Sequence, residues 1–205
     1  YLERYWNLGR YRKLEGQLMT IGQISNNELG SSVRAKINFN IDRGNKTHGW
    51  STSVDNQYTS GSPFVVTAGA TSNLPNNKSS GITTYLPDSS LGMYNGTRLI
   101  GDAVGDEYKC RISFQAFSSS NTGGYNIVVD ISAAGDGSNI IATYPVQMLK
   151  GSGSGNVQGY TTSVDYFTLN TFIANGGLIK IESVTGNTSI YGITYYLRKL
   201  SSGEY

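Results

Sequence analysis

Cysteine and histidine are nearly absent from this chain, which has one of each among 205 residues, Cys110 and His48. A single cysteine excludes a disulfide framework within the chain and a metal site built on cysteine pairs. A single histidine excludes a metal centre built from several imidazoles, and it leaves only one histidine that could act as a catalytic base. We therefore expect no metal and no cofactor.

Charged residues are also few, at 15% of the chain, and the formal net charge is only +2. Such a small positive excess does not favour binding to nucleic acid or to an anionic membrane. No apolar run approaches the length of a transmembrane helix, and no signal-like segment opens the chain. We therefore expect neither nucleic-acid binding nor membrane insertion. Since the chain starts at Tyr1 rather than at a methionine, we expect a fragment or a processed product.

Glycine and tyrosine are abundant, with 26 and 15 residues. Together with many Asn, Ser and Thr, they are typical of short strands joined by turns. Segments with apolar side chains at every second position predict half-buried strands, and no helical segment or fixed repeat intervenes. The sequence therefore predicts an all-β sandwich or barrel with antiparallel strands. The clearest alternating segments are 34–41, 107–117, 125–131 and 189–200, of which the second and third are expected to form a hairpin.

The closing segment 189–200 is apolar on both of its faces. Tyr191, Ile193 and Tyr195 fall on one face, while Ile190 and Tyr196 fall on the other. Gly192 leaves a gap, which indicates a bulge, a crossing or the close approach of another backbone. A strand of this kind is expected in the middle of a sheet or against a neighbouring subunit.

Carboxylates could carry out acid–base chemistry without histidine, as in glycosidases, which need two facing groups, one of them with a raised pKa. A Gly-Asp pair before a strand is more often a turn capped by the carboxylate, so we expect no enzymatic activity. The candidate carboxylates are Asp102, Asp106, Glu107, Asp130, Asp136 and Asp165. Asp136, Ser138 and Asn139 resemble half of a calcium loop but match no established motif.

Aromatic side chains in or beside polar loops give the broadest functional signal. Sugars bind in this way, with apolar C–H faces against rings and hydroxyls on amide and carboxylate groups, but the same rings would also serve a protein interface. His48, beside Trp50, is either an exposed loop histidine or part of a ligand-contacting pair. The candidate receptor- or glycan-binding residues are His48, Trp50, Tyr85, Tyr94, Asn121, Tyr125 and Tyr160.

Four segments carry a resemblance to a known family: YWNLGRY at 5–11, GDEYKCRISFQAF at 105–117, VDYFTLNTFIANGGLIKIES at 164–183 and TSIYGITYYLRKL at 188–200. In pattern rather than by a signature motif, the chain resembles the distal head domains of trimeric viral fibres. These are the heads of bacteriophage tail fibres, tailspikes and tail-needle knobs, with a jelly-roll or tumour-necrosis-factor-like fold. The likeness covers about residues 58–200.

The resemblance implies a homotrimer on a virion that binds a host cell-surface glycan or protein. It would bury Tyr191, Ile193 and Tyr195 near the threefold axis, and direct loops 68–88, 118–124 and 150–159 toward a receptor. Residues 57–205 would form the head, and residues 1–56 a neck or extra strands. Two alternatives stay open: a polysaccharide-degrading tailspike domain that uses paired carboxylates, and a purely structural head for trimerisation or decoration.

Overall fold

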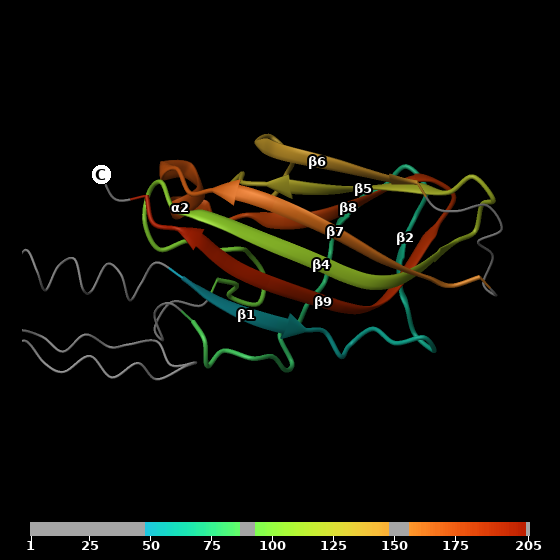
Figure 1. Ribbon diagram of the computed structural model, residues 1–205. Coiled ribbons are helices and arrows are strands. Elements are labelled where there is room, and N and C mark those ends of the chain that lie inside the picture. Colours follow the sequence, from blue (N-terminus) through green and yellow to red (C-terminus); the bar gives the residue numbers. More distant parts are fainter. Residues whose placement is uncertain (1–47, 87–92, 148–155, 204–205) are drawn as a thin grey trace, which may run out of the picture. The chain divides into compact units, whose positions relative to one another are not determined.

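The computed structural model describes residues 48–86, 93–147 and 156–203. These residues belong to one compact unit, residues 43–205, and form two antiparallel β-sheets that pack face to face (Figure 1). The strand predicted at 34–41 lies outside the described residues. No described helix is long and apolar enough to span a membrane.

The first sheet has the strand order β1-β9-β4-β7, and β9 also pairs with β2 beyond the end of β1. β1 lies within the segment 1–56, for which a neck or extra strands were considered, and it is a strand of the same sandwich as the rest. The strands are β1 (Gly49–Val54), β2 (Phe64–Val66), β4 (Glu107–Ser118), β7 (Gln158–Phe167) and β9 (Thr188–Ser201).

The second sheet has the order β3-β8-β5-β6, and the short helix α2 connects β7 to β8. Successive strands mostly alternate between the sheets, and the two orders together are those of a jelly roll, which confirms the predicted fold class. The elements are β3 (Thr71–Asn73), β5 (Gly124–Asp130), β6 (Ile140–Gln147), β8 (Leu178–Thr185) and α2 (Asn170–Asn175).

The hairpin predicted between 107–117 and 125–131 is wrong. β4 pairs with β7 and β9, whereas β5 pairs with β6 and β8 in the opposite sheet. The connection at 119–123 is short enough for a hairpin, but it crosses between the two layers. The crossing lets both strands turn their apolar faces toward the same core.

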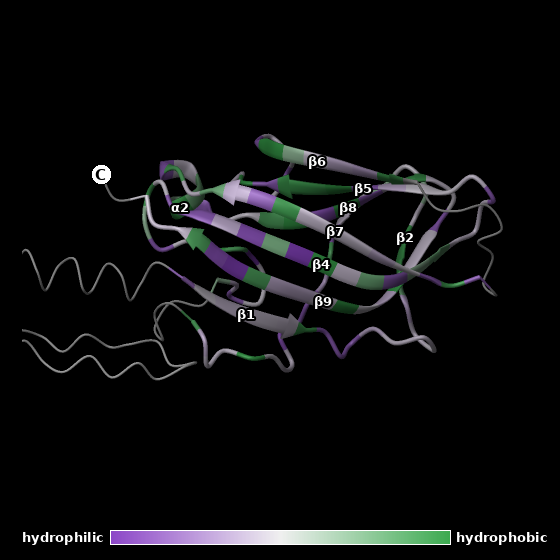
Figure 2. Cartoon of the chain, viewed as in Figure 1, coloured by the Kyte–Doolittle hydropathy of each residue, from purple (hydrophilic) through white to green (hydrophobic). Residues whose placement is uncertain are grey.

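The core lies between the sheets, and β4 shows how the sequence builds it. Its side chains alternate between buried and more exposed over the whole strand, and Figure 2 shows the matching change in hydropathy. Cys110 is fully buried, so its interpretation as a small core hydrophobe is confirmed, and burial raises the pKa of its thiol. The buried apolar side chains of β4 are Tyr108, Cys110, Ile112, Phe114 and Ala116.

Gly192 forms the bulge that the sequence indicated. Its φ is 64°, a left-handed conformation that suits glycine. Ser113 lies opposite Thr194 and Gln115 opposite Tyr191, so Phe114 alone faces two residues of β9. The extra residue changes the alternation along β9, and side chains from both of its apparent faces enter the core.

The predicted trimer contact of the closing strand is therefore wrong for Ile193 and Tyr195. Both are fully buried within the subunit. The Tyr195 hydroxyl donates a hydrogen bond of 3.0 Å to the Leu74 carbonyl, and its ring packs edge-on against Tyr94. Tyr191 is half-buried on the outer face. The apolar surplus of this strand is used inside one subunit.

Replacing Tyr195 with Phe should lower the free energy of unfolding by about 1 kcal/mol, because it removes a buried hydrogen bond. Tyr166→Phe is the matched control, since the buried Tyr166 hydroxyl has no hydrogen-bond partner in the described part of the chain. The control should leave stability unchanged or raise it. Urea denaturation measures both variants, and equal losses would contradict the role assigned to the Tyr195 hydroxyl.

Candidate functional site

The outer face of the β1-β9-β4-β7 sheet carries a continuous row of stacked side chains. Trp50 stacks against Tyr85 with ring centroids 4.9 Å apart, and against Tyr196 with centroids 5.6 Å apart. The Arg111 guanidinium carbon lies 5.0 Å from the centre of the Tyr196 ring. We call Tyr85, Trp50, Tyr196 and Arg111 the aromatic stack.

Strand register brings these side chains together. Arg111 lies directly opposite Tyr196 on β4. On β1, the residue directly opposite Tyr196 is Thr52, so Trp50 lies diagonal to Tyr196. Neighbouring strands lie about 4.8 Å apart, close to the spacing of stacked rings. The stack is therefore a cross-strand arrangement from positions far apart in the sequence.

Tyr85 reaches the stack from a segment beside β1. The N–H groups of Trp50 and Thr52 donate to the carbonyls of Tyr85 and Ile82, at 2.9 and 3.0 Å. Gly81 permits this approach, since a Cβ atom there would clash with the Thr52 carbonyl. The segment covers the outer edge of β1 and holds the Tyr85 ring against Trp50.

The stack presents ring edges to solvent. The rings of Trp50 and Tyr85 are inclined by only 17°, and those of Trp50 and Tyr196 by 23°. Because the centroids follow one another along the sheet, each ring covers the face of the next. Tyr85, at the end of the row, is 55% exposed. The Tyr85 ring and several ring edges are thus available to a ligand.

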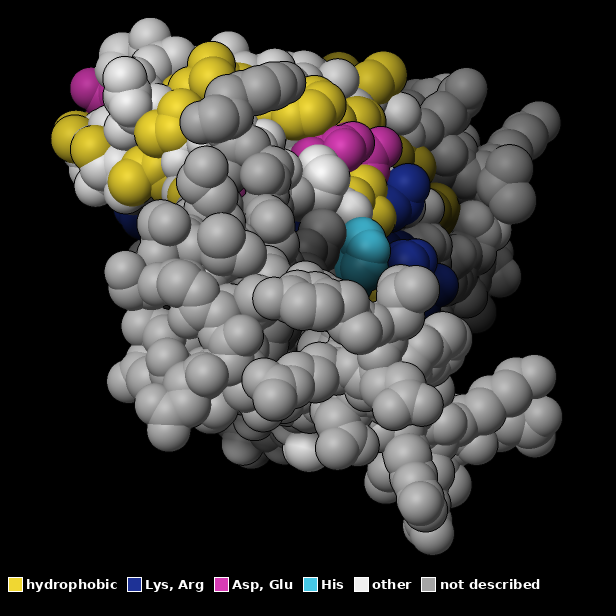
Figure 3. All heavy atoms as spheres, turned by 60° about the vertical axis from the view of Figure 1, so that its left-hand side comes forward, with side chains coloured by type: hydrophobic (Ala, Val, Ile, Leu, Met, Phe, Trp, Pro, Cys, Tyr) yellow, Lys and Arg dark blue, Asp and Glu magenta, His cyan; other side chains and the backbone are white. Residues whose placement is uncertain are grey.

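Charged and hydroxyl side chains surround the stack. Arg198 lies opposite Trp50 on one side and Lys109 on the other, and it is exposed. Lys109 forms an ion pair of 3.3 Å with Asp165. Figure 3 shows the chain's one histidine on the surface beside Lys and Arg side chains. The surface combines aromatic, cationic and hydroxyl groups.

The structure brings together only some of the predicted binding residues. Trp50 and Tyr85 are in contact, and the exposed His48 immediately precedes the same strand. Asn121 is exposed, but it follows the opposite end of β4. These two regions cannot form one small site.

The prediction that Tyr94 and Tyr125 bind a receptor is wrong, because both are buried in the core and cannot contact one. The Tyr94 hydroxyl donates to the Asn76 carbonyl, and burial raises the pKa of Tyr94. Tyr125 is the second residue of β5, and its side chain is directed inward. Tyr160, half-buried, packs its ring edge-on against that of Tyr125. At these positions, the presence of polar residues nearby in the sequence did not predict that the ring is exposed.

Sequence reasoning missed Tyr196 and Arg111 as members of the site. The only available signal was that both occupy outward positions of strands whose inward residues are apolar. Their proximity depends on the pairing of β9 with β4, which covers residues 196 and 111.

The carboxylates at 102–106 form a buried ion cluster. Lys199 Nζ lies 2.7 Å from Asp106 Oδ2 and 3.0 Å from Asp102 Oδ2. The Tyr108 hydroxyl and the Gly203 N–H also donate to Asp106. Burial alone would raise the pKa of Asp106, but the hydrogen bonds and positive charge of Lys199 hold it below its usual value of 3.8.

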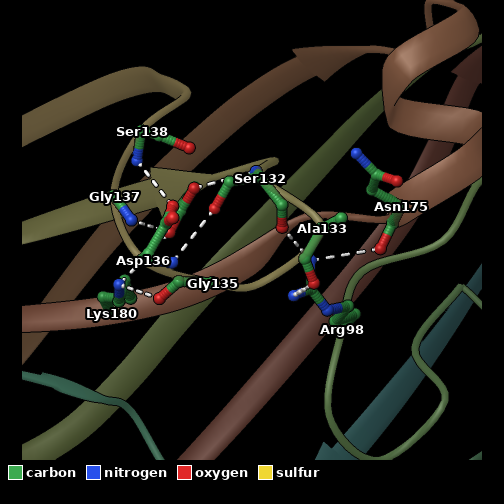
Figure 4. Close-up of polar contacts among 10 residues, drawn as sticks. Arg98, Ser132, Ala133, Gly135, Asp136, Gly137, Ser138, Asn175 and Lys180 are labelled. Carbon is green, nitrogen blue, oxygen red and sulfur yellow. Dashed lines mark hydrogen bonds and ion pairs between the residues drawn. The ribbon is translucent and has the colours of Figure 1, made fainter.

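The loop after β5, considered above as half of a calcium site, is organised by side-chain cations (Figure 4). Lys180 Nζ donates to Asp130 Oδ2 at 3.2 Å and to the Gly135 carbonyl at 2.6 Å. Arg98 donates to the Ser132, Ala133 and Asn175 carbonyls. Lys180 thus supplies the positive charge among the oxygens of this loop.

Asp136 caps its own turn, accepting a hydrogen bond from the Ser138 N–H at 2.9 Å. Hydrogen bonds from the Ser138 hydroxyl and N–H lower the pKa of Asp136 to about 2. The same type of contact is made by Asp130 with Ser132 and Gly137. Both carboxylates hold the backbone of the loop.

The described residues define a jelly-roll domain. Comparison with protein-family models and with curated proteins gives no match. Among solved structures, "Structure of Eiger TNF from S. frugiperda" has a TM-score of 0.48 and 11% identity, over 78% of this chain and 96% of that one. "PRD1 vertex protein P5" has a TM-score of 0.39 and 11% identity, over 76% of this chain and 74% of that one.

Replacing Asp106 with Asn should lower the free energy of unfolding by about 3 kcal/mol at pH 7, because the buried Lys199 loses the more buried of its two carboxylate partners. The folded pKa of Asp106 is lowered, so its contribution to stability is present above pH 3.8 and is lost as the pH falls through the folded value. The wild type should therefore lose more stability than the variant on acidification below pH 3.8. Urea denaturation across this range measures the difference; identical pH dependence would show that Asp106 is not held ionised.

Proposed function

We propose that this chain is the head domain of a homotrimeric viral fibre, which attaches a virion to a host cell through a surface glycan. The observation that carries the proposal is the aromatic stack, with exposed arginines beside it on an open sheet face. Rings at a site of this kind provide contact area, while the polar groups around them fix the orientation of a ligand.

The viral assignment rests on fold-level analogy and on the sequence resemblance to fibre heads. Jelly rolls occur among viral capsid and lectin domains, so the architecture suits both a virion component and a sugar-binding module. The proposed location is therefore the surface of the virion.

Carbohydrate fits the composition of the outer face. The exposed Tyr85 ring can accept the apolar C–H side of a sugar ring. Along the sheet from the stack, Ser113 and Thr161 form a hydroxyl pair with oxygens 3.2 Å apart, and Thr194 lies beside Ser113. Such hydroxyls donate to and accept from sugar hydroxyls. An extended saccharide could thus follow the sheet from Tyr85 across β9 and β4.

The homotrimer requires a contact other than Ile193 and Tyr195. Four exposed, large apolar side chains lie around α2 and the loop before β4, where the Gly105 N–H donates to the Thr168 carbonyl. Figure 3 shows hydrophobic side chains gathered on this end of the molecule. Exposed clusters of this kind commonly mark protein contacts, and we propose a second copy as the partner. The four residues, named here the apolar end patch, are Val104, Phe167, Leu169 and Ile173.

We propose that the domain acts without catalysis. A glycosidase needs one carboxyl group with a raised pKa, facing a second across the substrate. The pKa values of Asp106, Asp130 and Asp136 are all lowered. Asp106 and Asp130 are buried and paired with lysines, which favours a structural role.

Replacing Tyr85 or Trp50 with Ala should weaken binding to host cells or their isolated glycan by at least about tenfold, because each change opens the stack. Tyr85→Phe keeps the ring and should retain most of the binding. Val184→Ala, which removes an exposed apolar group from the opposite sheet, is the remote control. Affinity is measured by surface plasmon resonance on variants with unchanged thermal midpoints. Unaltered binding in both alanine variants would remove the stack from the site.

The solution mass should be near three times 22.1 kDa and should persist on dilution. Replacing Phe167 and Leu169 together with Asp should shift the mass toward the monomer, because charges would enter the proposed contact. Val65→Asp places a charge at another exposed apolar position and should leave the mass unchanged. Light scattering at two concentrations measures all three proteins. A monomeric wild type would contradict the homotrimer, and a trimeric double variant would exclude the apolar end patch.

A further inference from the structure

We infer that the aromatic stack recognises an acidic glycan, whose anionic groups bind Arg111 and Arg198. This inference rests on the proposed function and names the chemical class of its ligand. It follows from the ring orientation, from the pairing of charges on the sheet and from the groups beside the two arginines.

The orientation of the rings favours an anionic ligand. An aromatic ring carries partial negative charge on its faces and partial positive charge on its edge. Trp50 and Tyr196 have neighbours against their faces, so the stack directs mainly edges toward a ligand. A surface of ring edges favours electron-rich oxygens, whereas neutral sugars prefer open ring faces. Tyr85, at the end of the row, is the most exposed of the three rings.

The charged side chains on this sheet are only partly paired. On this sheet, the ammonium group of Lys109 is already neutralised by Asp165. Arg111 and Arg198 are both exposed, and neither forms an ion pair with a described carboxylate. Two guanidinium groups on adjacent strands therefore leave a local positive excess, although the net charge of the chain is small.

The Tyr196 ring holds the Arg111 side chain in a position that suits anion binding. Its guanidinium group lies over the Tyr196 ring, and stacking on an aromatic face leaves the N–H groups in the guanidinium plane free to donate. A planar fork of this kind matches a carboxylate or phosphate with two parallel hydrogen bonds. Since the ring restricts the side chain before binding, less conformational entropy is lost when the anion binds.

The neighbours of the arginines suit the rest of a sugar. Ser163 lies opposite Arg111 on β7, and Thr52 lies opposite Tyr196 on β1. A row of Thr52, Tyr196, Arg111 and Ser163 thus crosses four strands. The ligand class that matches it is a saccharide carrying carboxylate, sulfate or phosphate groups.

The test uses paired probes that differ only in charge. These are sialyllactose against lactose, and polygalacturonate against its carboxyl-reduced form, with dextran sulfate against dextran as the sulfate pair. The full chain should bind the acidic member of at least one pair about tenfold more tightly. The preference should shrink when NaCl is raised from about 50 to about 500 mM, because salt screens the attraction.

Arg111→Gln and Arg198→Gln should each remove most of the preference for the acidic probe, so that its affinity falls close to that of the neutral member of the pair. Lys109→Gln is the matched control, since it removes the same charge from the same face but from a group already paired with Asp165. It should retain the preference. Isothermal titration calorimetry gives the affinities, and circular dichroism checks that each variant folds.

The results separate the two levels of the proposal. Equal binding to both members of a pair, or an unchanged preference in Arg111→Gln and Arg198→Gln, overturns the acidic class and leaves a neutral glycan site. A loss as large in Lys109→Gln shows a general charge effect and also overturns it. Absence of binding to every probe, together with normal host-cell binding by Trp50→Ala and Tyr85→Ala, overturns both the acidic ligand and the proposed site.

Discussion

The pairing of β9 on both of its sides is the constraint on which the rest of the structure depends. β9 pairs with β1 and β2 along one edge and with β4 along the other. Its inward side chains, Ile190, Ile193, Tyr195 and Leu197, fill the core. Its outward side chains include Tyr196, which belongs to the aromatic stack, and Arg198 beside the stack. The same hydrogen-bonded ladder thus sets both the core and the candidate site.

The end of β9 is fixed by charge rather than by apolar packing. Lys199 is buried, and two carboxylates from the loop before β4 lie against its ammonium group. Isolated buried charges are costly, but pairing and further hydrogen bonds offset that cost. The cluster therefore connects the last strand to the loop that also carries part of the apolar end patch.

Much of the architecture was predictable from the sequence, because side chains in a strand alternate between faces. The pattern of β4 was sufficient to predict its inward residues and the burial of Cys110, and Gly192 indicated a bulge as one of three alternatives. Strand partners were less accessible. The sequence suggested a β4–β5 hairpin because the connecting turn is short, but nothing local specifies that the turn crosses between layers.

The candidate site was predictable only in part. Trp50 and Tyr85 stood out as rings among polar residues, whereas Tyr94 and Tyr125 stood out equally and are buried. Local composition does not distinguish an inward ring at the start of a strand from an outward one. Tyr196 and Arg111 could not be assigned to the site, because their contact depends on the register between strands distant in sequence.

The members of the aromatic stack differ in how firmly the sheet fixes their positions. Three of its members belong to paired strands, where a change of position would disturb the whole sheet. Tyr85 instead belongs to a segment that four backbone hydrogen bonds attach to the edge of β1, three donated by Trp50, Thr52 and Val54 and one donated by Ser79. Substitutions or insertions in that segment would alter the open end of the row and leave the sandwich intact. Descendants of this chain could thus acquire a new ligand preference through one short edge segment, with the arginine-bearing strands inherited unchanged.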